Sequence, residues 1–299
     1  MKTKISGLAE LGEADQKASQ YGSSMRDFQV LAELGRGSYG IVYKVQSLRD
    51  SQVYVLKKIC MKHMKPKHQA AALKEVQILR TISHPHIIRY HTSFVEDDAL
   101  HILMEYAEEG DLYRLLKEQR RKKKYFAERE VWRFAHELAV AVEYLHSRNV
   151  MHRDIKCLNV FLAKDRRLKL GDMGVSKIVQ SAGALQGTRV GTPLYLSPEL
   201  IRQQPYDLKI DVWALGCAVY HLASLEPPFY ADNLIALGNN IVHKAPKPLP
   251  SCFTPKLQSF IDKLLCKCST DRPSAKDVLA LFPAAVRRAR ENEPEEPAD

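Results

Sequence analysis

Apolar and polar residues alternate with a period of two over much of the first third of the chain. Stretches of this kind, rich in valine, isoleucine and tyrosine, are typical of half-buried strands. The stretches that predict strands are 30–34, 41–45, 52–58, 87–90 and 100–106. The first third of the chain is therefore predicted to form a β-rich lobe.

One helical pattern interrupts these strands, at about 67–82. Glu75, Leu79 and Ile82 recur there at helical spacing, so they share one face. A glutamate on the inward face of a helix needs a polar partner, because burying an unpaired carboxylate is costly. Lys57 on a preceding strand is the expected partner, and a solvated Glu75 is the alternative.

The apolar period is helical over most of the chain after residue 111. An apolar stripe along 128–146 predicts a helix that buries one face. The stripe consists of Val131, Ala135, Leu138, Val142 and Leu145. The stretch 211–225 is apolar on almost all sides, which is typical of a helix inside a lobe. The pattern as a whole predicts an α+β protein with a small β-rich N-lobe, one main helix in that lobe, and a larger helical C-lobe.

The two ends of the chain differ in composition from the part between them. Residues 1–27 are mostly polar and predict a flexible N-terminal extension. Residues 286–299 contain Glu-Pro repeats and predict a disordered acidic tail. Between them, we expect the N-lobe to span 28–106 and the C-lobe to span 107–285.

The formal net charge is +10, while the 45% hydrophobic and 27% charged residues are ordinary for a globular protein. Such a charge fits an acidic partner or nucleic acid, or solvated lysines around a pocket that holds a polyanion. The second interpretation is favoured, because no nucleic-acid-binding motif is present. The basic run 120–124 is either a docking or localisation patch or an exposed loop between helices, and the loop is favoured.

The six cysteines show no paired spacing, so free thiols in a reducing compartment are expected and zinc is not. The first residues lead into no apolar signal segment, and Lys2 stands where N-myristoylation requires glycine. No run of about 18 apolar residues predicts a membrane span. These features predict a cytoplasmic protein.

Gly35, Gly37 and Gly40 form a G-x-G-x-x-G motif, which dinucleotide-binding folds also carry. In those folds a helix follows the glycines, but here the strand-like stretch 41–45 follows. The glycines are therefore predicted to lie in a hairpin, where backbone without Cβ atoms can approach phosphates closely. Lys57 on the next strand would supply a positive charge for the same phosphates.

Two polar motifs lie close together after the predicted helix 128–146. The first is H-R-D-x-K-x-x-N over 152–159, and the second is Gly-Asp-Met-Gly over 171–174. One carboxylate in the first motif could orient a hydroxyl, while an amide and a second carboxylate could bind Mg²⁺. Phosphoryl transfer requires groups of these kinds.

Together with the glycines and Lys57, these motifs resemble the eukaryotic protein kinase domain over about 28–285. Within that family the chain looks most like the NIMA-related serine/threonine kinases, on the stretches 152–162, 168–172 and 191–200. The resemblance implies a bilobal protein kinase fold and transfer of the ATP γ-phosphate to Ser or Thr hydroxyls. It also implies roles in the cell cycle and at microtubules, and a location at the cytoskeleton, centrosome or cilium.

Site residues follow from the resemblance, position by position. The catalytic set is Asp154, Lys156, Lys57, Glu75 and Thr192, of which Thr192 favours a Ser/Thr acceptor over Tyr. The ATP-binding set is Leu34, Gly35, Arg36, Gly37, Ser38, Tyr39, Gly40, Val42, Val55, Lys57, Met104, Glu105, Ala107, Asp111 and Phe161. Asn159 and Asp172 would hold Mg²⁺. Glu199 would form a buried ion pair with Arg272.

Regulation is expected from Arg153 and Thr188. A guanidinium binds phosphate bidentately, so a phosphate on Thr188 would order the activation loop, residues 176–190. The phosphate would come from an upstream kinase or from autophosphorylation. Protein substrates are the expected partners, and nucleic acid is not. The family's coiled-coil tail is not found in this sequence, so the sequence does not support an oligomer.

Two residues depart from the usual kinase pattern. Met173 replaces the phenylalanine of D-F-G, and Leu158 replaces a glutamate common in kinases that select arginine before the acceptor. Weak selection for such arginines is therefore expected. Met173 also keeps a second hypothesis open, in which the fold binds nucleotide as a scaffold without catalysis.

Overall fold

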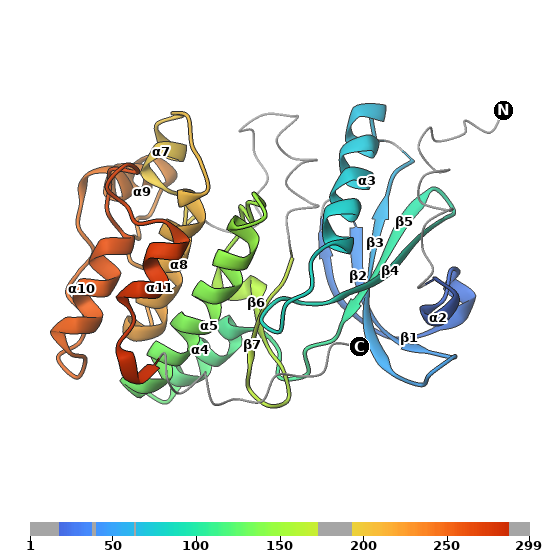
Figure 1. Cartoon of the computed structure of the whole chain (residues 1–299), viewed down its shortest axis with the longest axis horizontal. Helices are drawn as coiled ribbons and strands as arrows, with labels where there is room; N and C mark the ends of the chain where they lie inside the picture. Colours follow the sequence, from blue (N-terminus) through green and yellow to red (C-terminus); the bar gives the residue numbers. More distant parts are fainter. Residues whose placement is uncertain (1–17, 38–39, 63, 173–192, 287–299) are drawn as a thin grey trace. The chain divides into compact units, whose positions relative to one another are not determined.

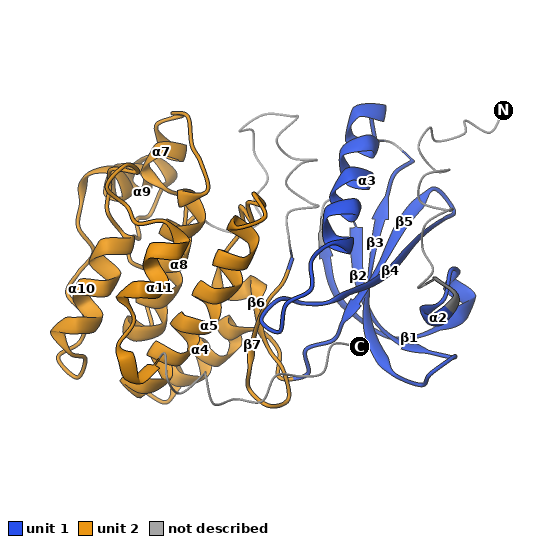
Figure 2. Cartoon of the chain, viewed as in Figure 1, with its two compact units in different colours: residues 1–108, 172–188 blue, residues 109–171, 189–299 orange. Residues whose placement is uncertain are grey.

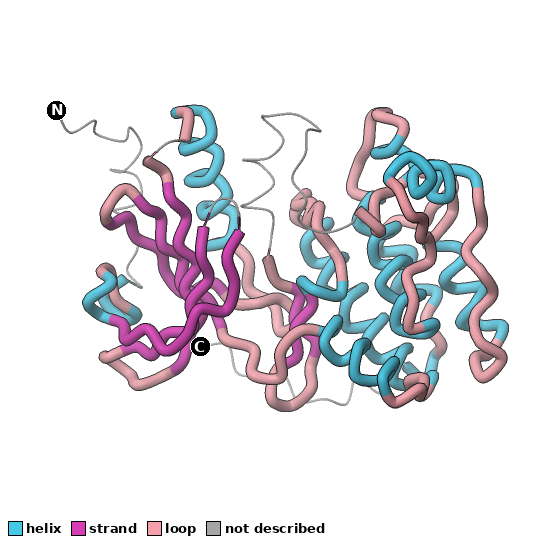
Figure 3. Tube along the Cα trace, turned by 180° about the vertical axis from the view of Figure 1, so that it is seen from behind, coloured by secondary structure: helices cyan, strands magenta, loops and turns pink. Residues whose placement is uncertain are grey.

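The computed structural model describes residues 18–37, 40–62, 64–172 and 193–286. The chain divides into two compact units, which Figure 2 distinguishes by colour. Unit 1 comprises 1–108 and 172–188, and unit 2 comprises 109–171 and 189–299. Strands dominate the described part of unit 1, whereas helices dominate that of unit 2 (Figure 3).

Unit 1 is built on a five-stranded antiparallel sheet in the order β1-β2-β3-β5-β4. The strands are β1 (Phe28–Gly37), β2 (Gly40–Ser47), β3 (Val53–Cys60), β4 (Tyr90–Glu96) and β5 (Ala99–Glu105). The strand predicted at 87–90 begins only at Tyr90 and runs on to Glu96, because this stretch pairs with β5. Helix α3 (Pro66–Arg80) lies between β3 and β4 in sequence, where one helix was predicted.

Successive side chains of β3 point to opposite faces of this sheet. Tyr54 and Leu56 belong to a buried cluster on one face. The other members of that cluster are Phe28, Val45, Phe94 and Leu103. Val55 and Lys57 therefore point to the opposite face, where the polar chemistry is expected.

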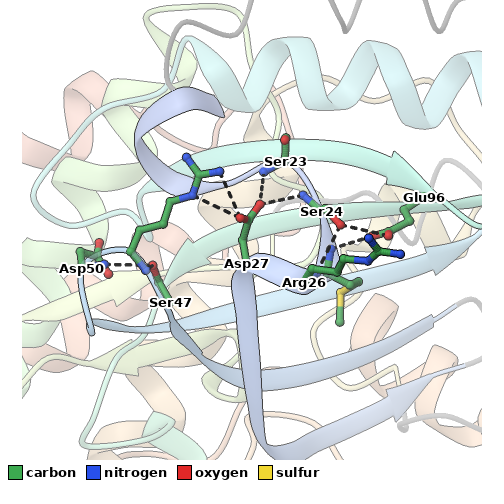
Figure 4. A network of polar contacts seen from close by, with 9 residues as sticks. Ser23, Ser24, Arg26, Asp27, Ser47, Asp50 and Glu96 are labelled. Carbon is green, nitrogen blue, oxygen red and sulfur yellow. Dashed lines mark hydrogen bonds and ion pairs between the residues drawn. The ribbon is translucent and has the colours of Figure 1, made fainter.

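Residues 18–27, part of the expected flexible extension, form the short helix α2 (Ala18–Tyr21) and the 3₁₀ turn η1 (Met25–Asp27). Glu96 of β4 accepts hydrogen bonds from Ser24 Oγ (3.1 Å) and the Met25 amide (2.6 Å), as Figure 4 shows. Asp27 accepts bonds from Arg49 and from the amide of Ser24. This segment is thereby fastened to the sheet of unit 1.

The described part of unit 2 contains helices, a 3₁₀ turn and a two-stranded sheet. Its helices are α4 (Leu112–Arg121), α5 (Glu128–His146), α7 (Pro198–Ile201), α8 (Lys209–Ser224), α9 (Leu234–His243), α10 (Pro255–Leu264) and α11 (Ala275–Leu281). The turn η2 (Cys157–Asn159) leads into β6 (Val160–Leu162), which pairs with β7 (Leu168–Leu170). The α+β class predicted from the sequence is confirmed.

Helix α8 forms the centre of unit 2 and packs against α5 and α10 (Figure 1). Every residue from Ile210 to Ala223 is buried, as its apolar pattern predicted. The predicted stripe of α5 is also buried along its whole length, so it forms core. In the described part of the chain, no helix has the length and apolar character that crossing a membrane requires.

Candidate active site

The glycine motif lies in a hairpin of unit 1, as its flanking strands predicted. Gly37 of β1 is opposite Gly40 of β2. A Cβ atom on Gly40 would come within 2.0 Å of the Lys58 carbonyl oxygen, so the strand pairing requires glycine at this position. Leu34 and Arg36 are exposed on β1, whereas Ser38 and Tyr39 lie outside the described residues.

Lys57 forms an ion pair with Asp172, which lies two residues after the end of β7. The Lys57 side chain is only 15% exposed. Glu75 is buried on α3, at 7% exposure. The expected pair between Lys57 and Glu75 stays a prediction, while the contact with Asp172 is an additional one that the sequence did not suggest.

The remaining ATP-binding candidates of unit 1 lie on adjacent strands. Val42 of β2 is opposite Lys57 of β3, and Val55 is opposite Met104 of β5. The Glu105 amide donates to the Arg89 carbonyl (2.9 Å), so a contact of Glu105 with adenine would use its own carbonyl oxygen. The register thus places three of the predicted apolar contacts around Lys57. Ala107, the next candidate along the chain, is buried.

Two ATP-binding candidates belong to unit 2 and are neighbours there. Asp111 and Phe161 form an isolated antiparallel bridge. The Asp111 carboxylate also accepts from the Arg114 amide (2.8 Å) and so caps the N-terminus of α4. This cap fixes the orientation of the carboxylate that was expected to reach the ribose.

The loop 152–159 of unit 2, which carries the H-R-D-x-K-x-x-N motif and is called the catalytic loop below, is held by a buried aspartate. Asp211, in the first turn of α8, accepts from the amides of His152 (2.8 Å) and Arg153 (2.9 Å). It also contacts His146 Nε2 at 3.0 Å. Arg153 has a positive φ of 67°, an uncommon conformation for a side chain of this size. The bonds to Asp211 stabilise that conformation.

The His152 side chain is buried, at 1% exposure, and its ring forms hydrogen bonds within and beyond the same loop. The Asp154 amide donates to His152 Nδ1 (3.3 Å), and His152 Nε2 lies 3.1 Å from the Gly171 carbonyl oxygen. These partners assign the proton to Nε2, so the ring is neutral and donates to Gly171. His152 therefore links the catalytic loop to the residue that precedes Asp172.

Asp154 is the point where three of the predicted residues meet. Its Oδ2 accepts from Lys156 Nζ and from Asn159 Nδ2, both at 2.9 Å. Asn159 Nδ2 also donates to the Asp154 carbonyl oxygen (2.9 Å). The carboxylate is thus fixed in orientation and lies beside a positive charge, as a group that orients a hydroxyl requires.

The donor set fits a divalent metal bound together with phosphates. The bonds from Asn159 use its amide nitrogen, which leaves its amide oxygen as the atom that would bind a cation. Within the described ranges, no cluster of three or more His, Cys, Asp or Glu residues could hold a metal alone. Mg²⁺ is commonly held by one or two protein oxygens plus phosphates and water, so the Asn159 amide oxygen and the Asp172 carboxylate are each of a type that suits it.

The predicted buried ion pair is confirmed. Arg272 donates to both carboxylate oxygens of Glu199, at 2.7 and 3.1 Å. Burial would raise the pKa of Glu199, but the hydrogen bonds and charge of Arg272 outweigh it and hold the pKa below its usual value. The pair joins α7 to the segment before α11.

Asp211 is not among the predicted site residues, because the sequence around it indicated only the start of an apolar helix. A charged residue at the beginning of an otherwise apolar helix was the available signal. Thr192, Thr188 and Met173 lie outside the described residues, so their predicted roles stay predictions.

Comparison with known proteins agrees with this geometry. A family model described as the protein kinase domain matches residues 28–281, and the chain belongs to this family. Serine/threonine-protein kinase Nek4 of Mus musculus is 38% identical over 247 residues, which cover 82% of this chain and 31% of Nek4. Probable serine/threonine-protein kinase nek2 of Dictyostelium discoideum is 35% identical, over 85% of this chain and 62% of nek2.

Serine/threonine-protein kinase Nek1 of Mus musculus is 36% identical over 85% of this chain and 21% of its own length. The expected similarity to NIMA-related kinases is therefore confirmed. The chain spans between about a fifth and three fifths of the length of these relatives.

Proposed function

We propose that the chain is a serine/threonine protein kinase that transfers the γ-phosphate of ATP to hydroxyls of protein substrates. The observation that carries the proposal is the arrangement around Asp154, whose carboxylate is held by Lys156 and Asn159 at 2.9 Å each. A carboxylate fixed in this way can accept a hydrogen bond from an acceptor hydroxyl and align its oxygen for attack.

Lys156 has a second role in this proposal. Its ammonium group lies beside Asp154 and is half-buried, so its charge is only partly screened by water. Phosphoryl transfer develops negative charge on the phosphoryl oxygens, and a fixed cation nearby lowers the barrier. Lys156 would therefore stabilise the transferring group while Asp154 orients the acceptor.

The phosphates and the metal would be held by different groups of the chain. Lys57 would pair with the α- and β-phosphates, and the backbone of the glycine hairpin would approach them closely. Asn159 and Asp172 would hold Mg²⁺, which neutralises phosphate charge when it is bound. Since Lys57 pairs with Asp172, nucleotide binding would exchange this ion pair for contacts of both groups with phosphate and metal.

The finer assignments rest on similarity to the family. Thr192 supports a Ser/Thr acceptor, and Arg153 would bind a phosphate on Thr188 added by an upstream kinase or by the protein itself. The names of the relatives support a serine/threonine kinase. A cytoplasmic location is proposed from the sequence features alone, and a role in the cell cycle, at microtubules or at the cilium from family resemblance alone.

Radiolabel transfer from ATP to casein tests the function. Asp154→Ala is expected to lower the rate by about 10²- to 10⁴-fold, because the group that orients the hydroxyl is lost. Asp262→Ala, which removes an exposed carboxylate bonded to Gln258 on α10, should leave the rate within twofold. Equal transfer by the wild type and Asp154→Ala would refute the proposal.

A further inference from the structure

Three polar side chains from distant parts of unit 2 form a chain of hydrogen bonds that the proposed chemistry does not use. The Tyr195 hydroxyl lies 3.2 Å from Cys157 Sγ and 2.7 Å from His221 Nδ1. Cys157 is 2% exposed and His221 is 7% exposed. Tyr195 thus bridges the turn η2 and the last turn of α8.

Burial keeps all three hydrogen-bonded groups uncharged. Burial raises the pKa of Cys157 to about 12, and it also raises the pKa of Tyr195. Burial, with a smaller contribution from Arg120, lowers the pKa of His221 to about 4. All three groups are therefore neutral at pH 7. With the His221 proton on Nε2, Nδ1 accepts from the Tyr195 hydroxyl, whose oxygen can then accept from the Cys157 thiol.

Helix α8 contacts the catalytic loop at two points through this arrangement. Asp211 in its first turn binds the amides of His152 and Arg153. His221 in its last turn reaches Cys157 through Tyr195. Ten residues separate Asp211 from His221, which is roughly 15 Å of helix. Because α8 is rigid and buried along its length, it can hold both ends of the loop at once.

Cys157 lies next to the groups that fix the Asp154 carboxylate. Lys156 precedes it and Asn159 follows two residues later, and both bond to Asp154. The turn between them is closed by a bond from the Asn159 amide to the Lys156 carbonyl (2.8 Å). A displacement of Cys157 would therefore move both partners of Asp154.

We propose that Tyr195, held by His221, is a positioning residue that anchors the Cys157 end of the catalytic loop and thereby aligns Lys156 and Asn159 with Asp154. The inference rests on the proposed kinase function for its effect on rate. The anchor itself is a structural property that can be measured without activity. The same bonds hold the Tyr195 side chain beside Cys157 of the catalytic loop.

Tyr195→Phe tests the anchor, because it removes the bridging oxygen and keeps the ring. Amide hydrogen exchange in a peptide covering 156–159 is expected to become about tenfold faster. With ATP and casein, kcat should fall about tenfold while KM for ATP stays within twofold, since loop geometry changes and nucleotide contacts do not. The matched control is Tyr113→Phe, whose ring lies 6.2 Å from the His221 ring. It should leave both readouts unchanged.

A pair of variants at His221 separates hydrogen bonding from packing. His221→Asn places an amide oxygen near the position of Nδ1, so it keeps an acceptor for Tyr195. His221→Leu fills similar space without one. We expect His221→Asn to stay within threefold of wild type in kcat and His221→Leu to match Tyr195→Phe. If Tyr195→Phe fails to fold, these two His221 variants still test whether the hydrogen bond to Tyr195 anchors the loop.

Two results would overturn the inference. One is equal hydrogen exchange over 156–159 in Tyr195→Phe and Tyr113→Phe, or in His221→Leu and His221→Asn where Tyr195→Phe does not fold. The other is faster exchange with unchanged kcat in an active enzyme. If the wild type transfers no phosphate, the proposed function fails, but hydrogen exchange still decides whether the anchor exists.

Discussion

Arg272 has no exposed side-chain surface, yet its guanidinium is bonded on several sides. It donates to both oxygens of Glu199, to the Lys209 carbonyl (2.8 Å) and to the Cys266 carbonyl (3.2 Å). Removing two charges from water is costly, and only complete hydrogen bonding offsets that cost. At the scale of the residue, the Arg272 guanidinium is stable when buried because three separate segments supply its hydrogen-bond acceptors.

Arg272→Met is expected to lower the free energy of unfolding by about 3–5 kcal/mol, because it leaves the Glu199 carboxylate buried without its cation. Methionine keeps most of the apolar stem, so lost packing contributes little. Urea unfolding monitored by tryptophan fluorescence measures the change. Lys122→Ala, which breaks an exposed pair with Glu118, should leave the urea midpoint unchanged. Equal midpoints for wild type and Arg272→Met would contradict this account.

At the scale of the element, α8 illustrates how close helix packing depends on a single missing side chain. A Cβ atom on Gly216 would lie 2.8 Å from Leu264 Cβ and 3.0 Å from Leu265 Cδ2. Real side chains do not approach this closely, so α10 reaches its position only because residue 216 is glycine. Helix α8 in turn carries Asp211, which holds the catalytic loop.

Gly216→Ala is expected to destabilise the protein, although alanine favours helices. Overpacking costs about 1–3 kcal/mol, which exceeds the gain in helix propensity of up to about 1 kcal/mol. Gly238→Ala on α9 is the matched control, because its Cβ would meet only the Ile201 side chain, at 3.3 Å. Thermal unfolding of both variants measures the difference. An increase in Tm for Gly216→Ala would show that α10 can move aside.

The α2–η1 segment (residues 18–27) shows the same dependence on partners from another element. Its polar composition is typical of a mobile terminus. The bonds from Ser24 and Met25 to Glu96 nevertheless fasten it to β4, and Tyr21 packs edge-on against Tyr54 at 6.1 Å. The two bonds to Glu96 join residues 72 and 71 positions apart, so composition alone could not indicate them.

At the scale of the whole molecule, the neutral His221 couples folding to pH. Its pKa is about 4 when folded and 6.5 when unfolded, so the unfolded chain binds a proton between these values and the folded chain does not. Stability is therefore present above pH 6.5 and is lost as the pH falls toward 4. The difference between the two pKa values corresponds to roughly 3 kcal/mol.

Urea unfolding at pH 7 and pH 4.5 tests this coupling, with His221→Asn as the control because asparagine does not titrate. The wild type should lose about 2–3 kcal/mol more than the variant between the two pH values. Other groups titrate in both proteins, so their contributions cancel in the comparison. Parallel losses in the two proteins would mean that His221 is protonated as readily in the folded state as in the unfolded chain.

The sequence by itself determined the features that local spacing encodes. Glycines followed by a strand predicted the hairpin at Gly37 and Gly40, and the stripe of α5 predicted its buried face. The H-R-D-x-K-x-x-N motif, through its resemblance to protein kinases, indicated Asp154, Lys156 and Asn159, and the structure shows that they meet at one carboxylate. These features could be predicted because each depends on residues within a few positions of one another.

Only the tertiary structure decided which distant groups hold the catalytic loop. Asp211 binds the His152 amide across 59 positions, and Tyr195 reaches Cys157 and His221 across 38 and 26. The pairing of Lys57 with Asp172 spans 115 positions. Hydrogen bonds of this kind leave no period in the sequence, because they depend on where packed helices and strands place each donor and acceptor.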